Sequence, residues 1–234
     1  MGIREISISG HKLTIHELED VCDSATGRVL TGSWLWDSSL LLSQWMATRA
    51  EDIRGKSVIE LGAGTGLPGL TAAMLGAGRV VLTDVEALLR GLERNVEVNG
   101  LGERVEVREL VWGSSSSSSE EEWVSSGARK GEGEFDIVLM SDVFLEVEAM
   151  GDLAKTLKRV CGSGSQVWCG SEVRQWTYEC LGQLVSEGFG VVELPSPVGV
   201  SDGSWDLFSI FHLIPPIEGC HVGEYLVLEG LGDA

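Results

Sequence analysis

The chain has 234 residues, a length that suits one domain with a full hydrophobic core, and its 43% hydrophobic content argues against global disorder. It carries 36 acidic and 17 basic residues, for a formal net charge of −19. Such a surface would repel phosphate backbones, so we do not expect nucleic acid as a substrate, and it would attract a basic protein.

The five cysteines, at positions 22, 161, 169, 180 and 220, show neither a CxxC motif nor metal-ligand spacing, so we expect no metal site. Reduced thiols would suit a cytoplasmic protein that also enters the nucleus. The first residues lack the apolar stretch of a signal peptide, and no apolar run approaches the roughly 18 residues of a membrane span. We therefore expect no membrane partner, and a monomer.

The N-terminal segment, up to about residue 30, is predicted to form a small β-hairpin ahead of the main fold. Residues 3–8 alternate apolar and polar side chains, and a second short apolar stretch, 13–15, follows Gly10. We expect both His11 and His16 on the surface of this hairpin.

A segment with two tryptophans, Trp34 and Trp36, precedes an apolar helix over residues 40–46. Asp37 or Ser38 is expected to cap that helix. In an extended backbone the two indoles point the same way, so one could belong to the core while the other lines a pocket.

Residues 57–84 predict a strand, a glycine loop, a helix and a second strand that ends in Asp84. Val58 to Leu61 reads as a buried strand, three glycines follow at alternate positions, and Pro68 suits a first helical turn. Glycines allow a sharp turn and a close approach by a ligand, and the carboxylate at the second strand tip can accept hydrogen bonds from a ribose. This unit therefore predicts an adenosine-type cofactor.

Two cofactors fit this pattern. The spacing Gly64-x-Gly66-x-x-Gly69, with Asp84 about 20 residues further on, matches the dinucleotide fingerprint of NAD enzymes. The reading Glu60-x-Gly62-x-Gly64-x-Gly66 is the pattern of S-adenosylmethionine (AdoMet) methyltransferases. Because the strand ends at Leu61, Gly69 would lie inside the helix as a packing glycine, and we favour AdoMet.

Further strands and helices alternate through the rest of the chain. A helix with Asn95 and Asn99 one turn apart is followed by strands over 105–107, 135–140, 166–171, 189–194 and 207–214, with helices at 149–160 and 174–187. The predicted fold is an α/β, seven-strand, Rossmann-like sheet, mostly parallel with an antiparallel last strand, in a single domain, 1–234. We expect a flexible acidic insertion at 114–134, which begins with six serines, and a C-terminal tail at 215–234.

Two residues beyond the second strand are candidates for the site. Trp112 follows the third strand, where its ring could cover an adenine, or could simply pack in the core. Asp142 follows the fourth strand, whose carboxyl end faces the crevice where ligands bind in a doubly wound sheet. It is the candidate catalytic carboxylate, and helix capping is the alternative.

Taken together, the glycine motif ELGAGTGLPGL, the segment LWDSSLLLSQWM, LTD with NVEVNG, and VWG resemble the methyltransferase-like 21 group of protein-lysine methyltransferases, also called methyltransferase family 16. The similarity runs from about Gly32 to Leu213. It implies AdoMet contacts from these residues: Trp36, Gly62, Ala63, Gly64, Asp84, Trp112 and Ser141. It also implies a protein substrate, such as a chaperone or a translation factor.

The family signature after the fourth strand is Asp-x-x-Tyr, and this chain departs from it. Asp142 is present, whereas Leu145 occupies the position of the tyrosine, beside Phe144. A methyltransferase must present a neutral amine to the sulfonium methyl, a role in which Asp142 would orient the amine and ease its loss of a proton. Without the tyrosine hydroxyl, a catalytically silent AdoMet-binding interaction module is the alternative, followed by an NAD-dependent oxidoreductase.

Overall fold

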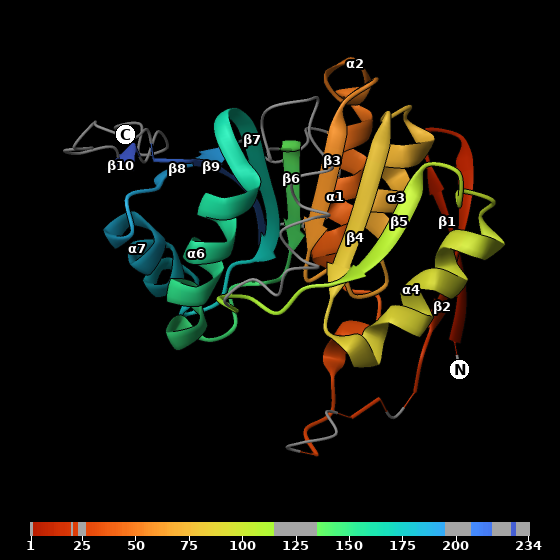
Figure 1. Ribbon diagram of the computed structural model, residues 1–234, viewed down its shortest axis with the longest axis horizontal. Coiled ribbons are helices and arrows are strands. Elements are labelled where there is room, and N and C mark those ends of the chain that lie inside the picture. Colours follow the sequence, from red (N-terminus) through yellow and green to blue (C-terminus); the bar gives the residue numbers. More distant parts are fainter. Residues whose placement is uncertain are drawn as a thin grey trace. The chain divides into compact units, whose positions relative to one another are not determined.

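The computed structural model describes residues 2–19, 21–22, 27–114, 135–194 and 207–216, together with the backbone of 226–227. Most of the predicted acidic insertion and of the C-terminal tail lies outside these ranges. The chain divides into two compact units (Figure 1): residues 1–111 with 139–141, and residues 112–138 with 142–234. None of the helices in the described ranges has both the length and the apolar character needed to cross a lipid bilayer.

The first unit contains a hairpin, three helices, two short helical turns and a parallel sheet. Its elements are β1 (Gly2–Ile8), β2 (His11–Glu17), η1 (Thr31–Ser33), α1 (Asp37–Ala47), α2 (Ala50–Ile53), β3 (Ser57–Leu61), α3 (Leu67–Met74), β4 (Arg79–Asp84), α4 (Glu86–Val98), β5 (Val105–Glu109) and the end of β6 (Phe135–Ser141). The strand order is β6-β3-β4-β5, and β4 is parallel to both β3 and β5. Apolar runs explain these strands, because the side chains from Val58 to Leu61 and from Val80 to Leu82 are all buried.

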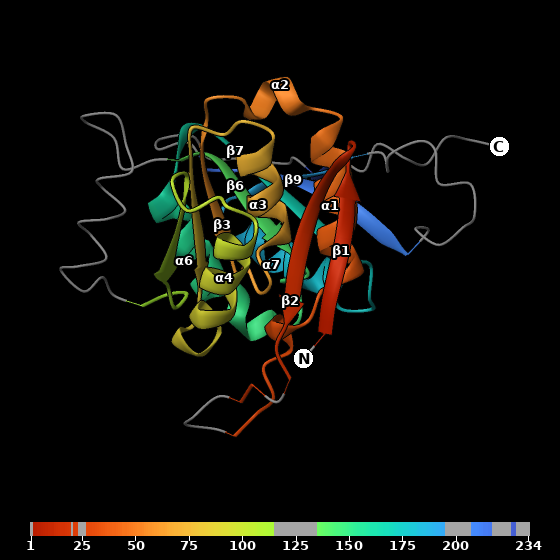
Figure 2. The same cartoon turned by 90° about the vertical axis from the view of Figure 1, so that its right-hand side faces the viewer.

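The hairpin β1-β2 forms a separate two-stranded antiparallel sheet that lies across α1, α3 and α4 (Figure 2). The predicted hairpin is therefore confirmed, and so are the strand, glycine loop, helix and strand of residues 57–84. The predicted cap of the apolar helix is wrong. The helix begins at Asp37 itself, Trp36 is the N-cap residue, and no side chain caps it. Instead the Ser39 hydroxyl donates to the Trp36 carbonyl oxygen at 2.6 Å.

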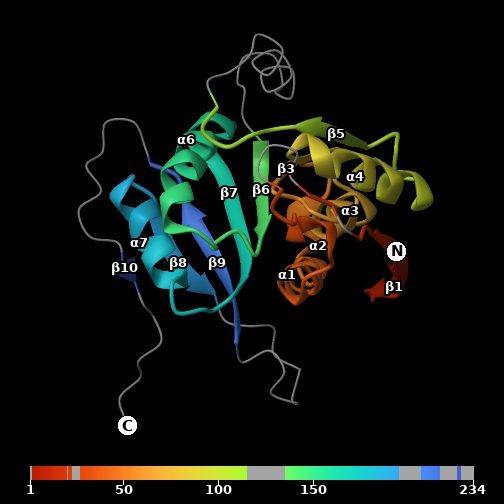
Figure 3. The same cartoon turned by 90° about the horizontal axis from the view of Figure 1, so that it is seen from below.

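The second unit comprises the start of β6, η2 (Val147–Ala149), α6 (Met150–Val160), β7 (Cys161–Glu172), α7 (Thr177–Ser186), β8 (Gly190–Leu194), β9 (Phe208–Ile214) and β10 (Leu226–Val227). The strand order is β10-β8-β9-β7-β6. β9 is antiparallel to both β7 and β8, as predicted for the last strand of the seven. Helices α6 and α7 pack against each other beside these strands (Figure 3). The order of the seven strands from β3 to β9 is that of the seven-strand methyltransferase fold, so the predicted fold class is confirmed.

Candidate functional site

The glycine loop between β3 and α3 adopts a backbone that favours glycine. Gly62, Gly64 and Gly66 have φ angles of 62°, 57° and 80°, all in the left-handed region. Gly66 is the N-cap of α3, and Pro68 lies in its first turn, where the missing N–H costs no hydrogen bond. These angles let the chain leave the buried strand and enter the helix within five residues, and the loop lies at the carboxyl end of β3, where such folds bind ligands.

Gly69 lies inside α3, as the sequence predicts for a packing glycine. A Cβ atom at this position would collide with the Leu82 side chain and would approach Glu60 Oε2 to 2.8 Å. The third glycine of the apparent dinucleotide fingerprint is therefore needed for the contact between helix and strand. The third glycine of a dinucleotide fingerprint has the same packing role, so the GxGxxG spacing by itself does not discriminate between NAD and AdoMet.

Asp84 holds the glycine loop from the tip of β4. Its Oδ2 accepts the Gly64 N–H and its Oδ1 accepts the Val85 N–H, both at 2.8 Å. Burial raises the pKa of this carboxyl, and the two amide donors act in the opposite direction. A carboxylate has about four acceptor positions, so Asp84 can accept further hydrogen bonds beyond these two.

The turn η1 covers this loop. A Cβ on Gly64 would come within 2.6 Å of the Gly32 carbonyl oxygen, and a Cβ on Gly32 would meet the Leu88 side chain at 2.8 Å. Gly64 therefore requires glycine, because its neighbour is a backbone oxygen and its φ is left-handed, whereas the Leu88 side chain could shift to admit a Cβ at position 32. The tryptophan segment and the glycine loop, about 30 residues apart in the sequence, thus touch through their backbones.

Glu60 is a fully buried carboxyl beneath the loop that we did not place in the site from the sequence. Its Oε2 accepts the Gly69 N–H at 2.8 Å, and its Oε1 has no hydrogen-bond partner among the described residues. Burial, opposed by the Gly69 amide and reinforced by the charge of Asp84, raises its pKa to about 8. The sequence feature that could have identified Glu60 is its position as an acidic residue inside an otherwise apolar strand.

Asn95 and Asn99 attach the hairpin to the loop. Asn99 pairs with both backbone groups of Thr14 at 2.8 Å, and Asn95 pairs in the same way with His16 at 2.8 and 3.2 Å. The Asn95 amide also donates to the Thr65 carbonyl oxygen in the glycine loop at 3.0 Å. The predicted surface position of His16 is wrong, because its backbone is held against α4 and its side chain is buried.

We expected one of Trp34 and Trp36 to belong to the core, but both side chains are exposed. Trp34 is 42% exposed and Trp36 is 37% exposed. Their ring centroids lie 6.4 Å apart with an interplanar angle of 39°. They do share one side of the segment, and both line the same pocket.

The second unit contains the candidates Trp112 and Asp142, and Ser141 ends β6 in the first unit. Trp112 lies partly buried in the turn after β5. Asp142 is buried and has a φ of 54°, a left-handed conformation that is uncommon for residues other than glycine. Its N–H donates to the Gly170 carbonyl oxygen at 2.8 Å. The next helical turn, η2, has Glu146 as its N-cap residue, so Asp142 does not cap a helix.

Arg174 binds the Asp142 carboxylate in a bidentate ion pair. Its Nη1 donates to Oδ1 at 2.8 Å and its Nη2 to Oδ2 at 3.0 Å, and a second ion pair reaches Glu172 at 2.6 Å. The hydrogen bond to Asp142 is the main cause that raises the pKa of this guanidinium. Sequence reasoning missed Arg174, because no local pattern links it to a carboxylate 32 residues earlier.

Leu145 occupies the position of the family tyrosine. Its side chain is exposed, whereas Phe144 is fully buried and makes an edge-to-face contact with Phe211 at a centroid distance of 6.0 Å. The Trp176 Nε1 donates to the Phe144 carbonyl oxygen at 3.0 Å. The segment after β6 is thus fixed by Arg174 and Trp176, which both lie in the connection between β7 and α7.

Comparison with known proteins decides the family. The family model described as lysine methyltransferase, Methyltransf_16, matches residues 11–180. The chain belongs to this family. The matched range includes the glycine loop, Asp84, Asp142 and Arg174.

The chain is similar in sequence to several curated lysine methyltransferases. Protein N-lysine methyltransferase METTL21A of Mus musculus is 36% identical over 60% of the chain and 60% of its own length. METTL21A of Danio rerio is 34% identical over 68% of the chain and 69% of its own length. EEF1A lysine methyltransferase 3 of Mus musculus is 32% identical over 70% of the chain and 63% of its own length. The chain thus spans about three fifths to two thirds of the length of the curated relatives it matches.

Solved structures of low sequence identity share the fold. A 16S rRNA methyltransferase of T. thermophilus in complex with AdoMet and guanosine has a TM-score of 0.56 at 19% identity, over 92% of this chain and 50% of that one. The ribosomal protein L11 methylase of Lactobacillus delbrueckii subsp. bulgaricus has a TM-score of 0.52 at 15% identity, over 79% of this chain and 81% of that one. These two likenesses confirm the fold.

Proposed function

We propose that the chain is an AdoMet-dependent methyltransferase that modifies a lysine side chain of a protein. The observation that carries this proposal is the family match over residues 11–180, which spans the glycine loop, the strand-tip acid and Asp142. The packing role of Gly69 is one that the third glycine of a dinucleotide fingerprint also has, so it does not discriminate between the two cofactors, and the family match is what favours AdoMet over NAD.

The residues of the first unit fit AdoMet. Gly62, Ala63 and Gly64 would contact the cofactor as the family resemblance implies, Gly62 and Gly64 are partly exposed, and Asp84 keeps acceptor capacity for ribose hydroxyls. Trp36 and Ser141 of the first unit and Trp112 of the second would complete the cofactor contacts that the family resemblance implies.

When bound, AdoMet supplies a methyl group activated by a sulfonium centre. The chain must then hold the lysine amine in line and in its neutral form, because an ammonium has no lone pair. Asp142 would accept a hydrogen bond from the amine and orient it. Arg174 balances the charge of this carboxylate and fixes its two oxygens, so Asp142 acts as an orienting acceptor while the proton leaves to solvent.

For the substrate, we propose a basic protein of the translation-factor or chaperone class. One relative is named for EEF1A, and the net charge of −19 favours a basic protein over nucleic acid. We further propose a monomer in which the two compact units form one methyltransferase domain, since the family model covers residues of both. The four cysteines in the described ranges, Cys22, Cys161, Cys169 and Cys180, are reduced, which supports a reducing compartment, the cytoplasm and also the nucleus.

The test incubates the purified protein with tritiated AdoMet and a cell lysate, and then analyses labelled bands for methyl-lysine. We expect at least one labelled protein with the parent and, at subsaturating AdoMet, labelling at least about tenfold weaker with Asp84→Ala. Leu145→Tyr, which restores the family tyrosine at an exposed position, serves as a companion. If the parent and Leu145→Tyr both bind AdoMet by calorimetry but label nothing, the chain is an interaction module. Tighter binding of NAD than of AdoMet would contradict the cofactor assignment.

A further inference from the structure

Two side chains from the connection between β7 and α7 reach the segment after β6, residues 142–145. Arg174 pairs with the Asp142 carboxylate, and two residues further on the Trp176 Nε1 donates to the Phe144 carbonyl oxygen at 3.0 Å. All of these residues belong to the second unit. The candidate catalytic carboxylate and an indole are therefore tied to the same short stretch of chain.

The connection that carries these two side chains is itself held by hydrogen bonds. At its start, the Val173 N–H donates to the Leu207 carbonyl oxygen at 2.6 Å. At its end, the Thr177 hydroxyl accepts the Arg174 N–H at 2.9 Å and donates to the Glu172 carbonyl oxygen at 3.2 Å. The backbone of the connection is thereby fixed, so both side chains keep defined positions against the segment after β6.

Trp176 is exposed although its orientation is fixed. Its exposed fraction is 40%, and Leu145, at the end of the segment after β6, is 48% exposed. Leu145 has no ring and Phe144 is fully buried, so Trp176 is the residue that offers this segment an exposed aromatic face. Binding sites typically combine such apolar walls with a few placed polar groups, and Asp142 is a polar group of this kind.

Charge alone does not equip this site to select a lysine. The Asp142 carboxylate is balanced by the guanidinium of Arg174, so it orients an amine but adds little net attraction for a cation. A lysine side chain consists of a flexible apolar stem and an amine that is protonated at neutral pH. An indole face suits both parts, because the stem packs on apolar surface and the ammonium is attracted to the π electrons.

We propose that Trp176 forms the aromatic wall of the site that receives the target lysine. Its indole packs along the stem of the lysine while Asp142 orients the amine, which makes Trp176 a specificity-determining residue for the acceptor. This inference rests on the proposed function for the identity of the bound side chain. It assigns to the connection between β7 and α7 both the residue that fixes the carboxylate and the residue that contacts the substrate.

The test measures equilibrium binding of a fluorescein-labelled peptide of alternating lysine and glycine by anisotropy, in the presence of the demethylated product of AdoMet so that no turnover occurs. Trp176→Leu keeps apolar volume without a π face, and we expect its affinity to fall about fivefold. Trp176→Phe keeps an aromatic face and should lose less than about twofold. Both variants lack the N–H that binds the Phe144 carbonyl oxygen, and neither changes the net charge.

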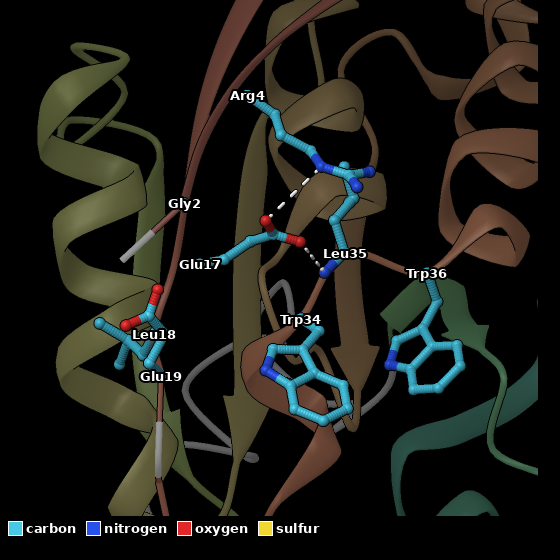
Figure 4. Close-up of a pocket in the computed structure, with 8 residues that line it drawn as sticks. All are labelled: Gly2, Arg4, Glu17, Leu18, Glu19, Trp34, Leu35 and Trp36. Atoms are coloured by element: carbon cyan, nitrogen blue, oxygen red, sulfur yellow. Dashed lines mark hydrogen bonds and ion pairs between the residues drawn. The ribbon is translucent and has the colours of Figure 1, made fainter.

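Trp34→Leu is the matched control. Trp34 is 42% exposed, close to the value for Trp176, and lines a pocket beside the hairpin in the first unit (Figure 4). The control therefore makes the same substitution at a similarly exposed indole outside the segment after β6. We expect it to bind the peptide like the parent, and we expect Trp176→Leu to keep the parent's affinity for AdoMet by calorimetry.

If Trp176→Phe and Trp176→Leu weaken peptide binding equally, the lost hydrogen bond explains the effect and the proposal is overturned. It is also overturned if the parent shows no saturable peptide binding, or if Trp176→Leu binds like the parent. The same holds if Trp34→Leu loses as much affinity as Trp176→Leu, since the peptide would then sense any exposed indole. A loss of AdoMet affinity in Trp176→Leu as large as its loss of peptide affinity would assign the ring to the cofactor instead.

The outcome is independent of whether the chain is active. Peptide binding that depends on the ring, in a protein that labels nothing in lysate, supports the aromatic wall while the proposed enzyme activity fails. Labelling of lysate by a protein whose peptide binding does not depend on the ring overturns the wall and leaves the proposed function in place.

Discussion

Asp84 is the residue on which the cofactor assignment depends most directly. Its two oxygens each accept one backbone N–H, from Gly64 in the loop and from Val85 at the start of α4. The same carboxylate therefore organises the loop and is the proposed ribose acceptor. Removing it should affect ligand affinity more than folding, because the residue lies at a strand tip.

Asp84→Ala should weaken AdoMet binding by roughly 1.5–3 kcal/mol, because charge-assisted hydrogen bonds to the ribose are lost. Isothermal calorimetry measures this change directly. Asp84→Asn is the control, because it keeps one acceptor oxygen for a backbone N–H and should preserve more of the loop. An affinity unchanged in Asp84→Ala would place the ribose elsewhere.

Asp142→Asn tests whether the carboxylate gripped by Arg174 takes part in methyl transfer. Asparagine has the same volume and tolerates the left-handed φ of 54°, so the fold and AdoMet affinity should persist. Turnover should fall by roughly a hundredfold, the scale for losing a group that acts on the amine in the transition state.

The control for this variant is Glu172→Gln, which removes the other carboxylate that contacts the same guanidinium. It should change turnover far less. If the two variants lose turnover equally, Asp142 acts only through the charge around Arg174. If Asp142→Asn keeps full turnover, the carboxylate has no role in methyl transfer.

Among the elements, the strand–loop–helix–strand unit was predictable because its signals are local. Apolar runs, alternate glycines and an acid lie within 28 residues, and parallel strands joined by one helix bring their carboxyl ends together. The element boundaries after residue 160 were less accurate. β7 begins at Cys161, five residues earlier than predicted, through a stretch of glycine and serine that carries no apolar signal.

The predicted helix 174–187 begins later, at Thr177. The Thr177 hydroxyl accepts the Arg174 N–H at 2.9 Å, so residues 173–176 form a turn instead of a first helical turn. This turn presents Arg174 to Asp142. Polar side chains that form hydrogen bonds with the nearby backbone compete with helix formation, and helix propensity alone does not show which of the two structures forms.

Gly69→Ala tests the contact between α3 and β4. Alanine favours a helix by about 1 kcal/mol over glycine, but its Cβ would meet Leu82 and Glu60. We expect a net loss of stability of about 1–3 kcal/mol, the usual cost of overpacking. Gly182→Ala in α7 is the control, because a Cβ there meets nothing within 4 Å and should raise stability. Chemical denaturation compares the two, and a stable Gly69→Ala protein would contradict the packing explanation.

At the scale of the whole molecule, sequence reasoning predicted the elements of one supersecondary unit and missed side-chain contacts between residues far apart in the chain. Gly64 and Asp84, which lie in that unit, were predicted to serve one cofactor, and the structure joins them by a hydrogen bond. Arg174 on Asp142 and Asn95 on the backbone of β2 are side-chain contacts across 32 and 79 residues. Such contacts depend on tertiary packing, which hydrophobic periodicity does not encode.

The stability of the whole chain should depend on pH through Glu60. Its pKa is about 8 in the folded protein and near 4.5 when unfolded, so between these values the folded state binds the extra proton. Stability from this group is therefore fully present below about pH 4.5, falls as pH rises towards 8, and then stays low. The slope approaches about 1.4 kcal/mol per pH unit within this window.

Glu60→Gln should flatten this decline, because glutamine can still accept the Gly69 N–H but does not titrate. Urea denaturation at a series of pH values from 5 to 9 gives the free energy of unfolding of both proteins. We expect the variant to gain stability relative to the parent as pH rises, whatever its absolute stability at pH 5. Parallel curves for the two proteins would show that Glu60 is ionised in the fold, and that its unpaired Oε1 is satisfied in another way.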